Sequence, residues 1–314
     1  SNDVVRPILN KSCKRFLLSF CPERTLEGNA LNELQTNPQI IGGIDEMSVS
    51  FSAMLFQKLT PNLVRASNIK TAEMIKLVAN AARDAKFAYS NEIAKACDYF
   101  GISAAEVISS GKLGYPRTDL ALPGPVGGPC LEKDPYIFAD GLKQYGFNPK
   151  ITIESRLLNE SMPQHALDLI NYWQKEVAGN KSVKKVVLLG LAFKGKPSTN
   201  DTRGSVGLKF GELVKKANPQ ANLFGFDETI DDAEMIRLGY IPTKSLVDAF
   251  DSADLVVIMN NHAAFENMAL ETLSEQMSKP ALIYDFWNNY RAEKLSLSAA
   301  TAYVALGSHN ALKG

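Results

Sequence analysis

The sequence lacks the features that define several large classes of protein. None of its apolar runs reaches the roughly 18 residues that a membrane-spanning helix needs, so no membrane-embedded segment is indicated. Its 34 basic and 34 acidic side chains cancel, so the overall charge provides no attraction to nucleic acid or to an anionic membrane surface. We therefore expect neither nucleic acid nor a membrane among its partners.

Cysteine and histidine are scarce and scattered. The four cysteines (Cys13, Cys21, Cys97 and Cys130) form no C-x-x-C pair, and the three histidines stand far apart in the sequence. This spacing indicates neither a zinc site nor a disulfide framework, so no metal centre is expected. A reducing cytoplasm fits such a chain best.

The usual phosphate-binding signatures are missing as well. The apolar run that ends at Gly190 is not followed by G-x-G-x-x-G, and no G-x-x-x-x-G-K-[ST] occurs. An anion site is still expected here, because Lys194 and Arg203 flank the start of a predicted helix over 205–217. Asp227, at the end of the next predicted strand, stands where a ribose-binding acid would lie, although acids are common at strand ends.

The most informative segment is the loop around Cys130, which reads Leu-Pro-Gly-Pro-Val-Gly-Gly-Pro-Cys from residue 122. Gly127 and Gly128 lack a Cβ, so we expect the backbone there to approach a bound molecule closely. The prolines stiffen the loop, while Lys133 and Asp134 follow closely enough to tune a thiol and orient water. Two interpretations stay open from these residues: a reactive nucleophile, or an inert buried cysteine beside a tight turn.

Hydrophobic patterning divides the chain into three predicted parts. Residues 1–50 are typical of the end of an α/β unit, and residues 51–180 are predicted to be helical. In residues 181–314, apolar strands alternate with amphipathic helices, which predicts a doubly wound parallel sheet. The predicted fold class is therefore α/β, with a central all-helical domain followed by a Rossmann-like sheet domain.

One long helix dominates the central part. Neither glycine nor proline interrupts residues 71–100, and their spacing predicts a single helix of about 45 Å at ~1.5 Å per residue. Such a length indicates a helix that joins two domains or forms a dimer interface. Lys76, Asn80 and Asn91 share one of its faces, which is either a solvated stripe or a surface that binds something.

The remaining elements follow from shorter patterns. Pro163 is expected to kink or break the helix that contains it. Helices are predicted at 4–11, 134–145, 153–177 and 232–238, and strands at 16–20, 40–44, 186–192, 223–227, 254–259, 281–285 and 301–306.

Four motifs occur in order along the chain. They are Cys21-Pro22-Glu23-Arg24 with Glu27-Gly28; Thr71-Ala72-Glu73 with Lys76, Asn80 and Asn91-Glu92; Gly127-Gly128-Pro129-Cys130 with Lys133-Asp134; and Gly190-Leu191-Ala192-Phe193-Lys194 with Asp201-Thr202-Arg203. Together they resemble the UDP-glucose/GDP-mannose dehydrogenase family, the nucleotide-sugar 6-dehydrogenases. Pro129 departs from that family's loop, which commonly has serine or histidine before the cysteine.

The resemblance implies three domains: an NAD-binding Rossmann domain, a helical domain built on a dimerising helix, and a Rossmann-like domain that binds the nucleotide of the sugar. The chain matches the end of the first domain (1–50) and all of the other two (51–180 and 181–314). The G-x-G-x-x-G unit would then lie upstream. On this basis we expect a truncated piece that is inactive by itself.

The same resemblance implies an NAD-dependent, four-electron oxidation of the C6 alcohol of a UDP-sugar to a carboxylate. Cys130 would add to the intermediate aldehyde, giving a thiohemiacetal and then a thioester. The implied catalytic residues are Cys130, Lys76, Asn80, Asp134 and Glu23; the substrate-binding residues are Arg24, Glu27, Arg117, Pro123, Gly124, Gly127, Gly128, Phe193 and Lys194; and the NAD-binding residues are Lys133 and Arg203.

The resemblance also bears on the sugar and on partners. Pro116-Arg117 and Pro123-Gly124-Pro125 favour a UDP-N-acetylhexosamine over UDP-glucose. The implied assembly is a homodimer formed through the long helix. An alternative function stays open, that of a nucleotide-sugar-binding module without catalytic activity.

Overall fold

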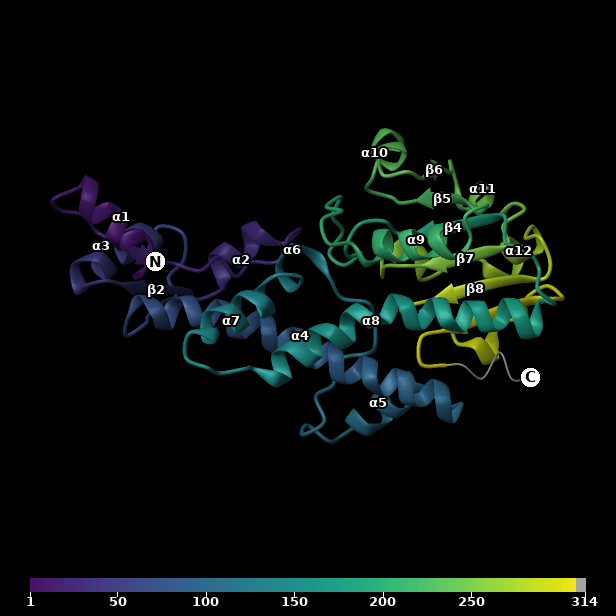
Figure 1. Cartoon of the computed structure of the whole chain (residues 1–314), viewed down its shortest axis with the longest axis horizontal. Coiled ribbons are helices and arrows are strands. Elements are labelled where there is room, and N and C mark those ends of the chain that lie inside the picture. The colour runs from purple at the N-terminus through teal and green to yellow at the C-terminus, as the bar shows by residue number, and fades with distance from the viewer. Residues whose placement is uncertain (309–314) are drawn as a thin grey trace. The chain divides into compact units, whose positions relative to one another are not determined.

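The computed structural model describes residues 1–308, and residues 309–314, the end of the predicted third part, lie outside that range. The chain groups into two compact units, residues 1–82 and 83–314, and the division falls within the long helix α4 (Ile69–Phe100). Figure 1 labels most of the elements and colours the chain from purple at the N-terminus to yellow at the C-terminus. Each unit has a sheet of its own.

The first unit contains a three-stranded sheet in which β1 runs antiparallel to β2 and β2 runs parallel to β3. Ile41 of β2 packs against Val49 and Ala53 of α3, which forms a small core. The predictions at 4–11 and 40–44 are confirmed, whereas only the end of the predicted strand at 16–20 pairs. The elements are α1 (Val5–Ser12), β1 (Ser19–Phe20), α2 (Ala30–Thr36), β2 (Gln39–Gly43), α3 (Glu46–Phe56) and β3 (Leu63–Arg65).

The predicted long helix is confirmed, because α4 runs for 32 residues without a break. In the second unit its C-terminal part is followed by a layer of further helices. These are α5 (Ala104–Lys112), the short α6 (Gly128–Leu131), α7 (Asp134–Lys143) and α8 (Lys150–Tyr172), which continues into a π-helical turn (Trp173–Val177).

Of the two outcomes expected at Pro163, a kink or a break, the break is wrong. Helix α8 continues through this residue. Proline removes one backbone hydrogen bond, but Met162 and Pro163 are both buried, and Met162 packs in the core with Ala166 and Ile170. Burial of this apolar face outweighs the lost hydrogen bond.

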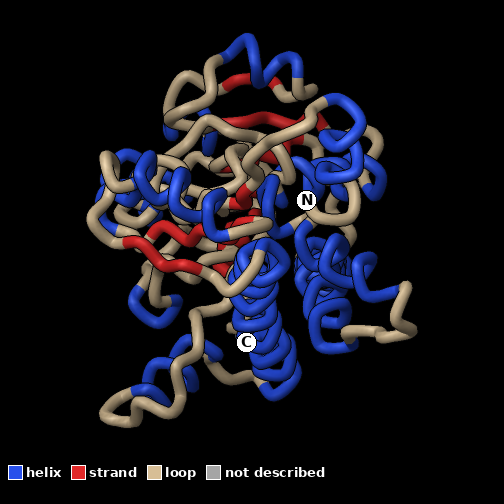
Figure 2. Tube along the Cα trace, turned by 90° about the vertical axis from the view of Figure 1, so that its left-hand side faces the viewer, coloured by secondary structure: helices blue, strands red, loops and turns tan. Residues whose placement is uncertain are grey.

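A six-stranded parallel sheet in the order β6-β5-β4-β7-β8-β9 forms the rest of the second unit. This confirms the predicted doubly wound sheet, and Figure 2 shows the strands in red. The strands are β4 (Lys185–Leu189), β5 (Asn222–Phe226), β6 (Ile241–Pro242), β7 (Leu255–Ile258), β8 (Ala281–Asp285) and β9 (Thr301–Ala305). Four helices accompany them: α9 (Val206–Ala217), α10 (Asp232–Arg237), α11 (Leu246–Phe250) and α12 (Leu270–Glu275).

Both faces of this sheet are buried. Val186 and Leu188 of β4 belong to the core cluster that contains Phe210 of α9 and Ile170 of α8. The alternate β4 residues face the opposite cluster, which includes Phe250 of α11. Strand order reverses between β4 and β7, so the carboxyl ends of these two strands mark the crevice where ligands bind to such sheets.

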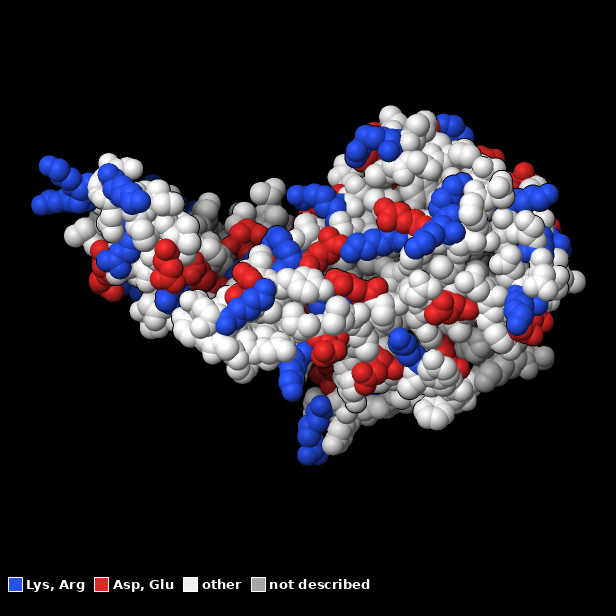
Figure 3. Space-filling view, in the orientation of Figure 1, with Lys and Arg blue, Asp and Glu red and all other residues white. Residues whose placement is uncertain are grey.

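Charge is mixed over the surface, since Lys and Arg lie among Asp and Glu on the face drawn in Figure 3. Within residues 1–308, no helix combines the length and apolar character needed to cross a bilayer.

Candidate active site

Cys130 lies in the short helix α6, and its side chain is exposed. Gly127 is the N-cap residue, and Pro129 falls in the first turn, where a missing N–H removes no helical hydrogen bond. The alternative of a buried cysteine is therefore wrong. Among the four cysteines, Cys97 of α4 is the buried one.

The two glycines also have a reason within the chain itself, because other parts of the chain fill the space where a Cβ would lie. A Cβ on Gly128 would lie 2.5 Å from the Phe193 ring, and Gly128 has a φ of +88°. A Cβ on Gly127 would meet the carbonyl oxygen of Gly204. Gly128 also donates its N–H to that carbonyl at 2.9 Å. The glycines thus permit the cysteine loop to pack closely on the β4–α9 loop.

Lys133 and Asp134 follow the thiol as a pair. The Lys133 ammonium donates to Asp134 Oδ1 at 2.7 Å, and the Asp134 carboxylate is buried at the start of α7. This hydrogen bond, together with the negative charges of Asp134 and of ionised Cys130, raises the pKa of Lys133 above its ordinary value, although burial opposes the change. The Lys133 ammonium is therefore close to the Asp134 carboxylate and within electrostatic reach of Cys130.

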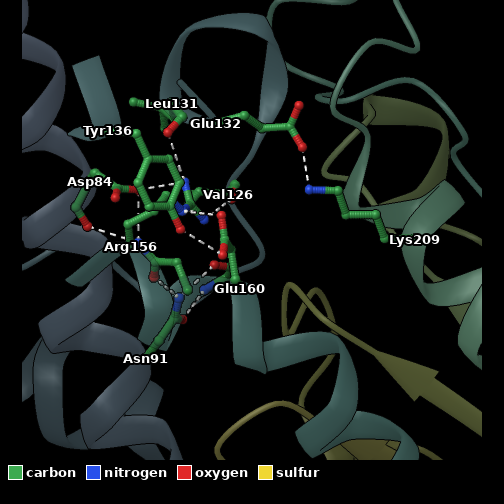
Figure 4. A network of polar contacts seen from close by, with 11 residues as sticks. Asp84, Asn91, Val126, Leu131, Glu132, Tyr136, Arg156, Glu160 and Lys209 are labelled. Carbon is green, nitrogen blue, oxygen red and sulfur yellow. Dashed lines mark hydrogen bonds and ion pairs between the residues drawn. The ribbon is translucent and has the colours of Figure 1, made fainter. Parts of the chain in front are cut away.

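A buried arginine lies under the cysteine loop (Figure 4). Arg156 of α8 forms an ion pair with Asp84 of α4 at 2.8 Å and donates to the carbonyls of Leu131 at 3.2 Å and Val126 at 3.1 Å. Its side chain is 2% exposed. Burial raises the pKa of Asp84, while the Arg156 guanidinium and the Asn159 amide oppose that rise.

A second polar group anchors the start of the same loop. Asn91 of α4 accepts a hydrogen bond from the Gly124 N–H at 2.9 Å and donates to the Gly124 carbonyl at 3.0 Å. The same amide donates to Asn159 Oδ1 at 2.9 Å, and Asn159 donates in turn to Asp84. Asn91 is therefore no part of a solvated stripe, because it is fully buried.

Sequence reasoning missed Asp84, Arg156 and Asn159. The residue spacing in their helices nevertheless indicated that these side chains are buried. Arg156 and Asn159 stand at helical spacing from the buried residues Met162 and Ala166, and Asp84 stands at such spacing from two buried alanines. A charged or amide side chain within an apolar stripe marks a buried polar contact.

The carboxyl end of β4 carries the expected anion-site residues. The ammonium of Lys194 lies 5.4 Å from the centre of the Phe193 ring. The guanidinium of Arg203 pairs with Asp201 at 2.6 Å, and its hydrogen bonds lower the pKa of Asp201. Asp227 instead supports the loop, since its Oδ2 accepts from the Leu191 and Ala192 N–H groups at 2.7 and 3.1 Å.

In the first unit, the structure brings together two of the predicted catalytic residues. The Lys76 ammonium donates to the Glu23 carbonyl oxygen at 2.5 Å and lies 3.9 Å from the Glu23 carboxylate. Asn80 follows Lys76 by one turn of α4. Arg24 donates to the Pro38 carbonyl at 3.0 Å, and Glu27 is exposed.

The remaining predicted substrate residues belong to the segment before Cys130. Arg117 is exposed, with its guanidinium 4.9 Å from the centre of the Tyr115 ring. Pro123 and Gly124 are buried, and a Cβ on Gly124 would lie 2.8 Å from Trp287. Gly124 thus packs the segment before Cys130 against Trp287, which follows β8.

Sequence models of two domains from one protein family match this chain. The central domain of the UDP-glucose/GDP-mannose dehydrogenase family matches residues 70–161, and the UDP binding domain of that family matches residues 187–292. Together these matches cover more than half of the chain. The chain belongs to the UDP-glucose/GDP-mannose dehydrogenase family. The first match contains Cys130 with its arginine network, and the second contains Phe193, Lys194 and Arg203.

Individual family members are similar over most of this chain. A UDP-N-acetyl-D-mannosamine dehydrogenase from Methanocaldococcus jannaschii is 33% identical over 267 residues, which is 85% of this chain and 58% of that protein. The solved UDP-N-acetylmannosamine dehydrogenase structure from Pyrococcus horikoshii has a TM-score of 0.83 at 26% identity and covers 98% of this chain and 70% of that one. The Staphylococcus aureus enzyme has a TM-score of 0.80 at 28% identity, with 100% and 70% covered. The chain thus spans 58 to 60% of the length of the first curated relatives.

Proposed function

We propose that the protein oxidises the C6 alcohol of a UDP-sugar to a carboxylate in two NAD-dependent steps, with Cys130 as the nucleophile. The observation that carries this proposal is the exposed thiol of Cys130 beside Lys133 and Asp134. These residues stand in a motif of a nucleotide-sugar dehydrogenase family. The residues with proposed roles come from all three predicted domains, 1–50, 51–180 and 181–314.

The proposed chemistry explains why a thiol is needed. Loss of a hydride and a proton turns the alcohol into an aldehyde, which gives up a second hydride poorly. Addition of the Cys130 thiolate to the aldehyde carbon forms a C–S bond and, after protonation of the oxygen, a thiohemiacetal. Loss of a second hydride and a proton gives a thioester. Attack by water then breaks the C–S bond, which releases the carboxylate and the thiol.

The other catalytic residues are assigned by what their groups can do. Lys76 has three N–H donors, one of which goes to the Glu23 carbonyl, so a developing oxyanion can receive another. Asn80 offers a neutral donor one turn further along α4. We assign Asp134 and Glu23 to orienting and deprotonating the water that cleaves the thioester.

We propose a UDP-N-acetylhexosamine as the substrate. Support comes from the Pro116-Arg117 and Pro123-Gly124-Pro125 motifs and from relatives named UDP-N-acetyl-D-mannosamine dehydrogenase. UDP-glucose is the competing substrate. The residues proposed to hold the UDP-sugar are Arg24, Glu27, Arg117, Pro123, Gly124, Gly127, Gly128, Phe193 and Lys194.

Two exposed cations fit an NAD pyrophosphate. The side chains of Lys133 and Arg203 are 60% and 75% exposed, so phosphate oxygens can reach both despite their carboxylate partners. NAD, when bound, accepts the hydride in each oxidation. Within this chain, the proposed part of Lys133 and Arg203 is to hold the cofactor's negative charge.

We further propose a cytoplasmic homodimer formed through α4. The helix exposes Tyr89, Tyr99 and Phe100, with side chains 56%, 77% and 77% exposed. Three large aromatic side chains exposed to solvent on one helix are typical of a surface that another protein covers.

The test of the catalytic proposal is Cys130→Ser in the whole protein. The wild type is expected to reduce two NAD⁺ per UDP-sugar. The variant is expected to stop at the aldehyde, because a serine hydroxyl is a much weaker nucleophile than a thiolate. Product analysis by mass spectrometry distinguishes aldehyde from acid. Acid formation at the wild-type rate would rule out the assignment of Cys130.

Calorimetry on this chain separates catalysis from simple binding. We expect UDP to bind, because the UDP binding domain is present, while NAD binds weakly. UDP binding combined with a whole protein that oxidises no UDP-sugar would favour the alternative, a nucleotide-sugar-binding module.

A further inference from the structure

We propose that Arg156 is a positioning residue, which holds the loop of Cys130 rigid by binding the two carbonyls on either side of the thiol. The inference rests on the proposed function for its catalytic consequence, whereas its structural part can be tested separately.

The guanidinium of Arg156 binds the loop at two points. Its Nη2 donates to the Val126 carbonyl at 3.1 Å, and its Nη1 donates to the Leu131 carbonyl at 3.2 Å. Cys130 lies between these two carbonyls in the sequence. Figure 4 shows the Arg156 side chain reaching both Val126 and Leu131. One planar group therefore fixes both ends of the segment that carries the sulfur.

Arg156 is itself fixed. Nη1 also binds Asp84 at 2.8 Å, and Nε forms an ion pair with the Glu160 carboxylate at 3.4 Å. The Glu160 carboxylate accepts a hydrogen bond from the Tyr136 hydroxyl at 3.0 Å. Both Asp84 and Arg156 are almost fully buried, with side chains 1% and 2% exposed. A buried, paired guanidinium has few alternative positions, so it can hold the loop with little freedom.

The loop is held from other directions as well. Asn91 binds both polar groups of the Gly124 backbone, and the Gly128 N–H binds the Gly204 carbonyl. Within this arrangement the Cys130 side chain stays exposed. Restricting the backbone around an exposed nucleophile keeps its sulfur in attacking geometry, where small displacements reduce the rate strongly.

The variant Arg156→Lys tests this role. Lysine keeps a positive charge beside Asp84 but lacks the planar fork that reaches two carbonyls at once. The matched control is Glu160→Gln, which changes another partner of Arg156 and touches neither carbonyl. If Arg156→Lys does not fold, the double variant Arg156→Gln with Asp84→Asn removes both charges of the buried pair together.

Hydrogen exchange on this chain measures the rigidity of the loop and requires no enzymatic activity. We expect Arg156→Lys to speed exchange of the amides of residues 128 and 130–133 at least about tenfold, with strands β4 and β7 unchanged, because local opening frees these amides alone. Glu160→Gln should exchange like the wild type. Unchanged loop exchange in Arg156→Lys, an equal change in the control, or faster exchange throughout the fold would overturn the proposal.

Steady-state kinetics of the whole protein measures the catalytic consequence of changing Arg156. Arg156→Lys should lower kcat at least about tenfold with KM changed less than about twofold, since the loop geometry matters for the chemical step. Equal losses in kcat and in folded fraction would mean that Arg156 only supports stability, which contradicts the proposal. Altered loop exchange in a protein whose wild type oxidises no UDP-sugar would leave Arg156 holding the loop and reject the proposed function instead.

Discussion

The N–H of Gly128 donates to the carbonyl of Gly204 at 2.9 Å, and this hydrogen bond joins the loop of Cys130 to the loop that precedes α9. One loop belongs to the match with the family's central domain, and the other to its UDP binding domain. The proposed nucleophile and the proposed nucleotide site therefore share a backbone contact.

Replacing Gly128 with alanine should disrupt this contact. The new Cβ would require a φ of +88° and would lie 2.5 Å from the Phe193 ring, so we expect a loss of about 2 kcal/mol or more in the free energy of unfolding. Urea denaturation measures it. The control is Gly141→Ala in α7, where a Cβ meets nothing within 4 Å, and it should stabilise the chain slightly. A neutral Gly128→Ala would contradict the close packing of Gly128 against Phe193.

Replacing Asn91 with alanine should remove three hydrogen bonds at once. The Gly124 N–H, the Gly124 carbonyl and Asn159 Oδ1 would all lose a partner in a buried site, and the expected cost is about 2 to 4 kcal/mol. The neighbouring Glu92→Ala is a suitable control, because Glu92 is exposed on the same helix. Thermal and urea unfolding compare the two, and similar stabilities would show that the Asn91 contacts contribute little.

Replacing Lys181 with methionine should loosen the segment between the helical layer and β4. The Lys181 ammonium pairs with Asp254 at 2.6 Å and also donates to the carbonyls of Ser278 and Pro280. Because Asp254 is buried, the loss of its cation should cost about 3 kcal/mol. The exposed Lys184 gives the control Lys184→Met, which is expected to be nearly neutral. A stable Lys181→Met chain would argue against this role.

Asp285 should make stability depend on pH. Full burial raises the pKa of this carboxyl from 3.8 to about 6, although the N–H groups of Trp287 and Asn289 and the Tyr303 hydroxyl oppose the rise. Between these two values the folded state holds a proton that the unfolded state has released, so the contribution of Asp285 to stability falls as the pH rises from about 4 to about 6.

The variant Asp285→Asn isolates that contribution. It should be less stable than the wild type, because an asparagine at residue 285 has one acceptor oxygen fewer for the Trp287 and Asn289 N–H groups and the Tyr303 hydroxyl. The difference between the two chains should nevertheless narrow by about 3 kcal/mol between pH 4 and pH 7, since the wild type alone carries the cost of a buried charge. Urea titrations across this range measure the difference in free energy of unfolding between the two chains. If that difference widens as the pH rises, ionised Asp285 stabilises the fold.

Much of the architecture could be predicted because it depends on local pattern. Uninterrupted spacing over residues 71–100 predicts α4, and apolar runs such as that of β7 predict buried strands. The helix around Pro163 was predicted, but a break there was wrong, since proline disfavours a helix locally while the burial of α8 favours it globally. Short strands such as β3 and β6 carry too few residues to show a period.

By itself the sequence determined the order of the motifs, the alternation of strands and helices, and the thiol that stands among glycines and prolines. Tertiary structure alone decided what surrounds that thiol: the Phe193 ring against Gly128, and the arginine under the loop. Arg156 and Asp84 are 72 residues apart in the chain. Contacts of this kind arise when helices bury their faces together, because a buried charge must then find its partner wherever the fold supplies one.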